Sequence, residues 1–363
     1  MINKISGENR GDLLRERIFK PMGLKRTMLD FPTKNESNFA NAYNTLDNTL
    51  PVEIQTVRAT ATTFTGAAAG LRTCVKDLLV LYQAFLQAAG DQFATRKTST
   101  PGSPLKQVSC LMSAQIPLDQ ETLNEASYAY GWVRAQLPGP LGAVGCNPSL
   151  MPDGTPIMGK DAPSRLVLYH QGSLPGALSA TFLVPESETV VVVMTNSLSL
   201  CDTPDWVGQL MLEELFEIPE RNDYMAAATA SVAKNLEWFS NVTEELRQKQ
   251  KQNTSSRPLE VYVGVYWNAV KTMKIVVTLE RGDLYWSVQG LKSEKYVLAH
   301  YHDDVFSWLR PRNELVARGR WVDQGAEFWL IRFGATEGGD VDHLAWVHEL
   351  EVSDGETFRR KEQ

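Results

Sequence analysis

The sequence has few cysteines and lacks any long apolar run. Its four cysteines never show the C-x-x-C spacing of a zinc knuckle, and they could form two disulfides or none. No apolar stretch reaches the roughly 18 residues that a membrane-spanning helix needs. The opening residues Met1–Ile5 lack the apolar core of a signal peptide. The sequence therefore predicts no membrane span and no secretory address; a full-length form could be secreted, and the protein is otherwise expected in the cytoplasm.

An excess of positive charge is also missing. The formal net charge is −7, which argues against nucleic acid or an anionic membrane surface as a partner. With 43% hydrophobic and 22% charged residues, the composition is ordinary for a globular protein. A chain of 363 residues exceeds what one compact core usually holds, so about two domains are expected.

The stretch Ser164–Asn196 has the clearest organisation. Its three short apolar runs are rich in Val, Leu and aromatic residues, which is typical of strands: Leu166–Tyr169, Leu178–Val184 and Val190–Met194. The polar connection Pro185–Glu188 predicts that the last two pair as an antiparallel hairpin. Between the first two runs lies His170–Gly176, with two glycines and a proline. A histidine at a strand end beside such an open backbone predicts a site at the rim of the sheet.

Helices are predicted on either side of this hairpin. Asp12–Phe19 is amphipathic, and Pro204–Ile218 should pack on the sheet. Cys74–Ala88 is apolar around most of its girth and should be buried, with Thr73 as N-cap and Asp77 in the first turn.

The segments between these helices are expected to be mostly irregular. Residues 30–65 and Ala89–Gln107 are polar and rich in turn residues, which predicts loops. Tyr128–Val133 has alternating aromatics and predicts a strand whose two tyrosines pack in the core. Pro138–Pro163 is rich in proline and glycine and could overhang the site.

The character of the sequence changes after a polar linker. Short aromatic or β-branched runs with turns between them predict an all-β barrel or sandwich; they are Leu259–Tyr266, Thr272–Leu279, Leu284–Val288, Tyr296–His302, Val305–Leu309, Arg318–Val322, Glu327–Phe333 and Leu344–Val347. His300 and His302 share a strand face, but no carboxylate or cysteine set completes a metal site, so none is predicted. The expected domains are residues 1–222, a linker at 223–258, and 259–356.

The triad His170-Gln171-Gly172, with the two strands that follow, resembles the third motif of the serine β-lactamase and penicillin-binding-protein superfamily, in the branch of class C β-lactamases and related esterases. The resemblance implies an α+β fold, here a partial β-lactamase/transpeptidase-like domain with an antiparallel sheet packed by helices. The segment after Leu259 resembles the small lipocalin-like β-domain of many fungal β-lactamase-like proteins.

The same resemblance implies a chemistry. His170 would act as the third-motif donor, Gln171 and Gly172 would bind the substrate, and the backbone N–H of Ser173 would supply half of an oxyanion hole. Complete relatives transfer the acyl group of a small-molecule ester or amide through an acyl-serine, as hydrolases or acyltransferases, without a cofactor or metal.

The nucleophile motif of that family, Ser-x-x-Lys, has no convincing counterpart. Ser103…Lys106 has the spacing but lies in a predicted loop, and Ser231…Lys234 follows the third motif, so both are expected to be accidental. The chain is expected to start downstream of this motif and of the family's Tyr-x-Asn, with activity impaired. The alternative is a non-catalytic protein that binds a ligand or partner. An apolar face left uncovered predicts a possible homodimer.

Overall fold

The computed structural model describes residues 2–31, 38–63, 65–118, 122–349 and 352–361. The chain divides into two compact units, residues 1–236 and 237–363. The boundary lies inside the long helix α7 (Tyr224–Lys249).

The first unit is built on a six-stranded antiparallel sheet with the order β10-β9-β8-β5-β4-β3. The predicted α+β class is confirmed, and so is the predicted antiparallel hairpin of the last two apolar runs, which form β9 and β10. The strands of this sheet are β3 (Ile116–Pro117), β4 (Ala126–Tyr128), β5 (Val133–Leu137), β8 (Arg165–Leu174), β9 (Ala177–Val184) and β10 (Thr189–Thr195). Two short sheets accompany it, formed by β1 (Ala42–Thr45), β2 (Pro51–Ile54) and β11 (Ser197–Leu198), and by β6 (Gly139–Pro140) and β7 (Ile157–Met158).

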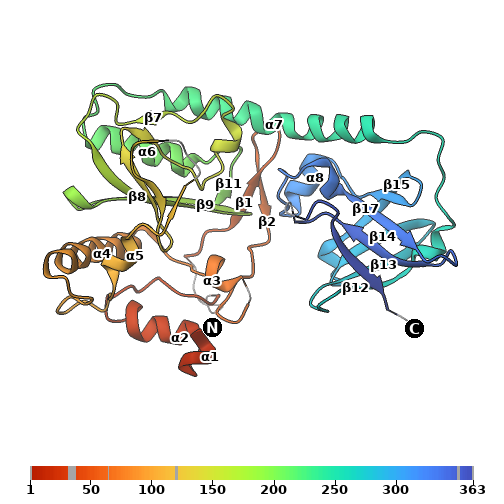
Figure 1. Cartoon of the computed structure of the whole chain (residues 1–363), viewed down its shortest axis with the longest axis horizontal. Coiled ribbons are helices and arrows are strands. Elements are labelled where there is room, and N and C mark those ends of the chain that lie inside the picture. The colour runs from red at the N-terminus through yellow and green to blue at the C-terminus, as the bar shows by residue number, and fades with distance from the viewer. Residues whose placement is uncertain (1, 32–37, 64, 119–121, 350–351, 362–363) are drawn as a thin grey trace. The chain divides into compact units, whose positions relative to one another are not determined.

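Helices cover both faces of the large sheet, with α4 (Val75–Thr95) on one side and α6 (Thr203–Leu215) on the other (Figure 1). One apolar cluster joins α4 to Leu168 and Leu183, and a second joins Leu212 of α6 to Tyr169 and Phe182. The remaining short helices are α1 (Ile2–Ser6), α2 (Arg10–Leu14), α3 (Gly66–Ala69) and α5 (Val108–Met112). The prediction that Pro204–Ile218 is a helix packed on the sheet is confirmed.

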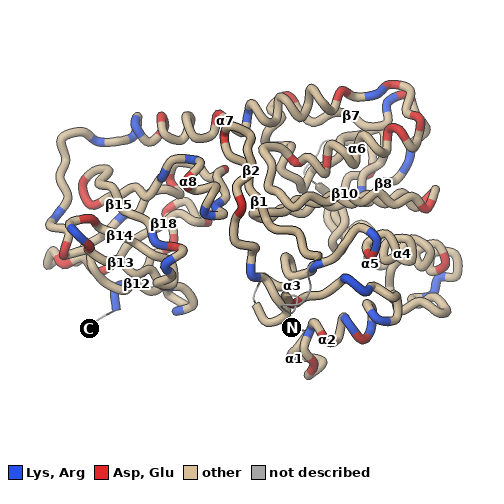
Figure 2. Tube along the Cα trace, turned by 180° about the vertical axis from the view of Figure 1, so that it is seen from behind, with Lys and Arg blue, Asp and Glu red and all other residues tan. Residues whose placement is uncertain are grey.

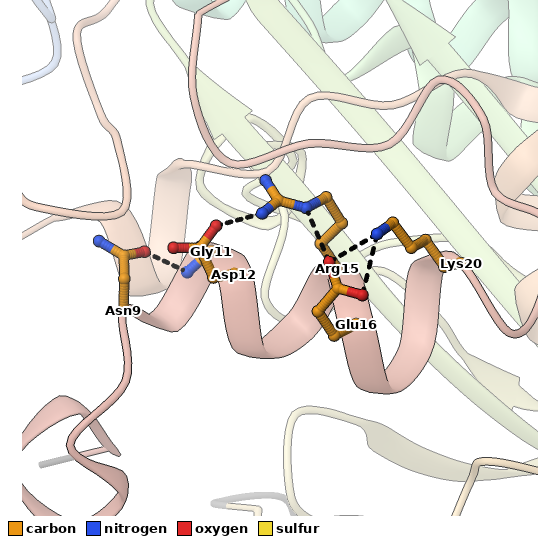
Figure 3. Close-up of polar contacts among 6 residues, drawn as sticks. All are labelled: Asn9, Gly11, Asp12, Arg15, Glu16 and Lys20. Carbon is orange, nitrogen blue, oxygen red and sulfur yellow. Dashed lines mark hydrogen bonds and ion pairs between the residues drawn. The ribbon is translucent and has the colours of Figure 1, made fainter.

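The predicted helix near the N-terminus is confirmed as α2 followed by a π-helical turn, Arg15–Phe19. Figure 3 shows how its polar residues hold it: the Asn9 side chain caps the helix by accepting from the N–H of Gly11 at 2.8 Å. Arg15 pairs with Asp12, and Lys20 donates to the two carboxylate oxygens of Glu16 at 2.7 and 2.9 Å. These pairs are exposed, so each contributes little to stability.

Several predictions about the surrounding segments are wrong. The N-cap of α4 is Cys74, and the Thr73 hydroxyl instead contacts Thr27. The helix continues to Thr95, into the first part of the predicted loop Ala89–Gln107. It is not buried all round, because Leu79 and Val80 on its outer side are 39% and 42% exposed. The predicted loop at 30–65 contains β1 and β2. Each of these strands has only four residues, too few to show the apolar–polar alternation that predicts a strand.

The predicted strand Tyr128–Val133 is a hairpin turn between β4 and β5. Its reversal is closed by the N–H of Ala129 donating to the Trp132 carbonyl at 2.7 Å, with Gly131 at φ +82°. Tyr130 on the turn is 57% exposed, so its predicted place in the core is wrong.

The second unit is a closed eight-stranded antiparallel barrel. Its strands are β12 (Gly264–Asn268), β13 (Lys274–Glu280), β14 (Asp283–Val288), β15 (Lys295–His302), β16 (Val305–Ser307), β17 (Leu330–Ala335), β18 (Val341–Trp346) and β19 (Glu356–Arg360), with the helix α8 (Arg312–Ala317) between β16 and β17. The predicted strand at Arg318–Val322 is wrong, because that segment follows α8 without strand structure. The closing strand β19 was not predicted, because three of its five residues are charged and the buried Phe358 is its one apolar residue.

Aromatic side chains fill the barrel. Trp308 packs its ring within 5.3 Å, between centroids, of the rings of four other aromatic residues, Trp286, Tyr296, Phe328 and Trp329. Eleven of the 24 buried residues that form the core of this unit are aromatic, and large rings of this kind bury much apolar surface each. In the described part of the chain, no helix is long and apolar enough to cross a membrane.

Candidate active site

The alternation of side chains along β8 separates the residues of the predicted motif. His170 pairs with Thr181 and Gly172 with Ser179 of β9, so these four residues share the sheet face that α4 covers. Gln171 points to the opposite face, where it is only 3% exposed. The predicted rim residues are therefore contiguous in sequence but are divided between two faces.

His170 is held by a residue that is distant in the sequence. Its Nε2 lies 3.0 Å from the hydroxyl of Tyr128, at the end of β4. Its Nδ1 faces the carbonyl oxygen of Gln171, which can only accept, so Nδ1 carries a proton. In the neutral ring, Nε2 then accepts from the Tyr128 hydroxyl. Tyr128 therefore makes a polar contact with the predicted site residue in addition to any packing.

The edge of β8 beside this pair is open. Strand β5 pairs with β8 from Leu137↔Arg165 to Val133↔Tyr169 and ends there. From His170 to Leu174, the pairing found in the described residues is with β9 alone. Alternate N–H and C=O groups along an uncovered strand edge are free to bind an extended substrate or a carbonyl oxygen.

The backbone of this edge is shaped by its glycines. A Cβ on Gly172 would lie 2.7 Å from the Ser179 hydroxyl oxygen. Only glycine therefore fits here without a shift of β8 or of the Ser179 side chain. At the turn into β9, Gly176 has φ +85° and donates its N–H to the Asn44 side chain of β1 at 2.9 Å. The segment 170–174 is thus anchored at its far end.

Beneath the strand, on the other face, lies a buried polar cluster that sequence reasoning missed. Asp205 of α6 is fully buried, and its carboxylate accepts from the amide groups of Gln171 at 2.7 Å, Asn147 at 3.0 Å and Gln209 at 3.1 Å. The helix N-cap Asp202 lies beside it and accepts from the N–H of Asp205 at 3.3 Å. The only signal in the sequence is an ordinary N-cap pattern, Asp-x-x-Asp, which does not reveal burial.

The segment Pro138–Pro163 contributes to this cluster rather than to the site. Asn147 binds Asp205, and the N–H of Ala143 donates to the Tyr169 hydroxyl at 3.2 Å. Both contacts lie on the α6 face, opposite His170. The predicted overhang of the site by this segment is therefore wrong.

Burial, and next the charge of Asp205, raises the pKa of Asp202 to about 7 from an ordinary value of 3.8. The folded state therefore holds a proton that the unfolded state releases near pH 4, and this stabilisation disappears as pH rises through 7. Between pH 5 and 7, we expect the wild type to lose about 2 kcal/mol of unfolding free energy relative to Asp202→Asn. Urea unfolding of both proteins, followed by far-UV circular dichroism at each pH, measures this difference. Parallel pH dependences would contradict the raised pKa.

Neither Ser-x-x-Lys match lies where it could act on the site. Ser103 lies in a turn, where its hydroxyl accepts from the N–H of Leu105. Ser231 in α7 is fully buried. Neither serine is therefore an accessible residue at a helix N-terminus, which is where this family places its nucleophile.

The histidines of the barrel have local partners. His300 contacts the carbonyl of Asp303, His302 the Asp303 carboxylate, and His348 the Glu356 carboxylate at 2.8 Å. Among the residues that the structure describes, no group of three or more His, Cys, Asp or Glu side chains is arranged to hold a metal ion. None of the four cysteines forms a disulfide with another described cysteine.

Comparison with known proteins assigns both units to sequence families. Residues 1–207 match the family model described as Beta-lactamase, and residues 248–360 match a domain of unknown function, DUF3471. No curated protein matches.

Solved structures with a similar fold include an octameric penicillin-binding protein homologue from Pyrococcus abyssi, at 16% identity and a TM-score of 0.41, covering 99% of this chain and 62% of that one. A class C β-lactamase from Rhodobacter sphaeroides has 18% identity and a TM-score of 0.37, over 66% of this chain and 56% of that one. A D-stereospecific amidohydrolase from Streptomyces has 17% identity and a TM-score of 0.36, over 59% and 50%. The chain thus spans less than two thirds of the length of these structures.

Proposed function

The chain belongs to the beta-lactamase family, whose model covers more than half of it, and from that premise we propose that its first unit is an acyl-transfer scaffold that binds the carbonyl of a small ester or amide at the open edge of β8. The observation that carries this proposal is the His170–Tyr128 pair beside an unpaired strand segment. A proton-exchanging group next to free backbone N–H groups is the arrangement that acyl transfer requires.

The absence of charged residues from this part of the sheet supports a neutral substrate group. From Leu166 to Val184 the sequence contains no Lys, Arg, Asp or Glu. After its first residue, Arg165, strand β8 carries no charged side chain, so its tube is tan in Figure 2. An ester or amide carbonyl, which needs hydrogen-bond donors rather than an ion partner, fits this edge better than a phosphate or a polyanion.

The proposed roles follow from position. The backbone N–H of Ser173 binds the carbonyl oxygen, and Gly172 leaves room for the acyl group. Water attacks the carbonyl carbon while its proton passes through the Tyr128 hydroxyl to Nε2 of His170. The imidazolium then returns that proton through Tyr128 to the ester oxygen, or to the amide nitrogen, as the bond from that atom to the carbonyl carbon breaks. Transfer to another hydroxyl in place of water would make the same scaffold an acyltransferase. In a longer form that supplies a serine nucleophile, the acyl group would pass through an acyl-serine.

Without such a nucleophile, the reaction should be slow but measurable. Serine proteases that lack a triad residue still accelerate hydrolysis roughly 10³-fold over water, through binding and the oxyanion hole alone. We expect this chain to hydrolyse 4-nitrophenyl acetate saturably above the buffer rate. His170→Ala should lower kcat/KM about 100-fold, because it removes the proton acceptor. Release of 4-nitrophenolate is the measurement.

The matched control is His300→Ala, which removes an exposed histidine of the barrel and should leave the rate unchanged. Equal rates for the wild type and a folded His170→Ala variant would overturn the proposal. The burial of Ser231 and the turn around Ser103 favour a second candidate, ligand binding without chemistry. That candidate predicts no hydrolysis above buffer, together with a shift of the His170 NMR signals on addition of the stable amide 4-nitroacetanilide.

A further inference from the structure

We infer that Gln171 and Asp205 are positioning residues. From the sheet face that α6 covers, they hold β8 so that His170 and the Ser173 N–H are correctly placed at the open edge where substrate binds. The inference rests on the proposed function, but it concerns side chains on the opposite face of the sheet from any substrate. It assigns a role to the buried polar cluster around α6.

Among the described residues, strand pairing supports residues 170–174, the site segment, along one edge only. Tyr169 is the last residue of β8 that pairs with strands on both sides. The next five residues are held by β9 along one edge only. A strand with one free edge slides and twists more easily than a central strand, and catalytic geometry tolerates little displacement. The site segment therefore needs a restraint that the sheet does not supply.

Gln171 supplies such a restraint at the centre of the segment. It lies directly between His170 and Gly172, and its side chain is 97% buried from solvent, with its amide nitrogen 2.7 Å from Oδ1 of Asp205. Because the strand alternates, fixing the side chain of Gln171 on one face fixes its neighbours on the other.

Asp205 is itself immobilised. It lies in the first turn of α6, where the helix dipole favours a carboxylate. Its second oxygen, Oδ2, accepts from Asn147 and Gln209, so the carboxylate joins three elements while Oδ1 serves Gln171. Gly142 makes room for this arrangement, because a Cβ there would lie 2.7 Å from Oδ2. The site segment of β8 is thus held in place by a helix and a loop, through Asp205, and not by a second neighbouring strand.

A pair of variants separates positioning from general stability. Gln171→Met keeps the size of the side chain and removes the donor to Oδ1. Gln209→Met removes a donor to Oδ2 of the same carboxylate, but from within α6. Both variants lose one buried hydrogen bond to Asp205, so both should be less stable in urea. Only Gln171→Met should affect the site.

The decisive readout is the imidazole nitrogen spectrum of His170 at constant pH, with the five histidine signals assigned with His170→Ala. We expect Gln171→Met to move the His170 signals and to lower kcat for 4-nitrophenyl acetate about tenfold, while Gln209→Met leaves both at wild-type values. Unmoved His170 signals in a folded Gln171→Met protein, or equal movement in both variants, would overturn the inference. A wild type that hydrolyses no ester would contradict the proposed function alone, because the nitrogen spectrum tests the positioning independently.

Discussion

Replacing Trp308 with alanine is expected to destabilise the barrel by about 4 kcal/mol. Trp308 is 1% exposed and lies at the centre of the aromatic core, with the ring of Trp329 4.5 Å away between centroids. Its indole N–H donates to the Phe328 carbonyl at 3.0 Å, but that oxygen also accepts from Trp346 at 2.8 Å and keeps a partner in the variant. The loss of unfolding free energy therefore reports the cavity that the missing indole leaves, and not a buried carbonyl without a hydrogen-bond donor.

Urea unfolding followed by tryptophan fluorescence tests this prediction, because seven of the nine tryptophans lie in residues 237–363. The matched control is Trp267→Ala, on the half-buried outer side of β12, which should cost no more than about 1 kcal/mol. Similar losses in the two variants would contradict an aromatic core centred on Trp308.

Two identical glycine substitutions in helices are expected to change stability in opposite directions. Gly208 of α6 faces the buried ring of Phe182 on β9, and a Cβ there would lie 2.2 Å from a ring carbon. Gly208→Ala should therefore push α6 away from the sheet at a cost of about 3 kcal/mol. Gly90 of α4 is exposed and has nothing within 4 Å of its Cβ position. Gly90→Ala should stabilise by about 1 kcal/mol, through helix propensity alone.

Chemical unfolding monitored by far-UV circular dichroism compares the two variants. Adding Phe182→Leu to Gly208→Ala should recover part of the loss, because the smaller side chain makes room for the new methyl group. A neutral or stabilising Gly208→Ala would mean that α6 does not approach β9 as closely as described.

The parts of the fold that the sequence predicts are those with dense local patterns. The runs around Leu178–Val184 and Val190–Met194 contain only uncharged, mainly β-branched or apolar residues, and they form strands as expected. The wrong predictions involve segments whose partners decide their structure. Strand β19 is mostly charged yet closes the barrel, since pairing on both sides outweighs a weak apolar pattern.

The same distinction applies to the candidate site. His170 stands out because of its neighbours in the sequence, whereas Tyr128, 42 residues earlier, becomes its partner only through the pairing of β4, β5 and β8. Gln171 was predicted to bind substrate because it lies inside the motif. Its alternation places it on the buried face with Asp205, 34 residues later. Contacts of this range cannot be read from a local pattern without the register of the sheet.

The most direct test of the central claim is a crystal structure of the chain soaked with 4-nitroacetanilide. The account predicts the amide carbonyl oxygen at the open edge of β8, about 3 Å from the backbone nitrogen of Ser173, with the acyl group over Gly172 and the leaving nitrogen towards Tyr128 and His170. Binding elsewhere on the chain, with the edge from His170 to Leu174 unoccupied, would contradict it.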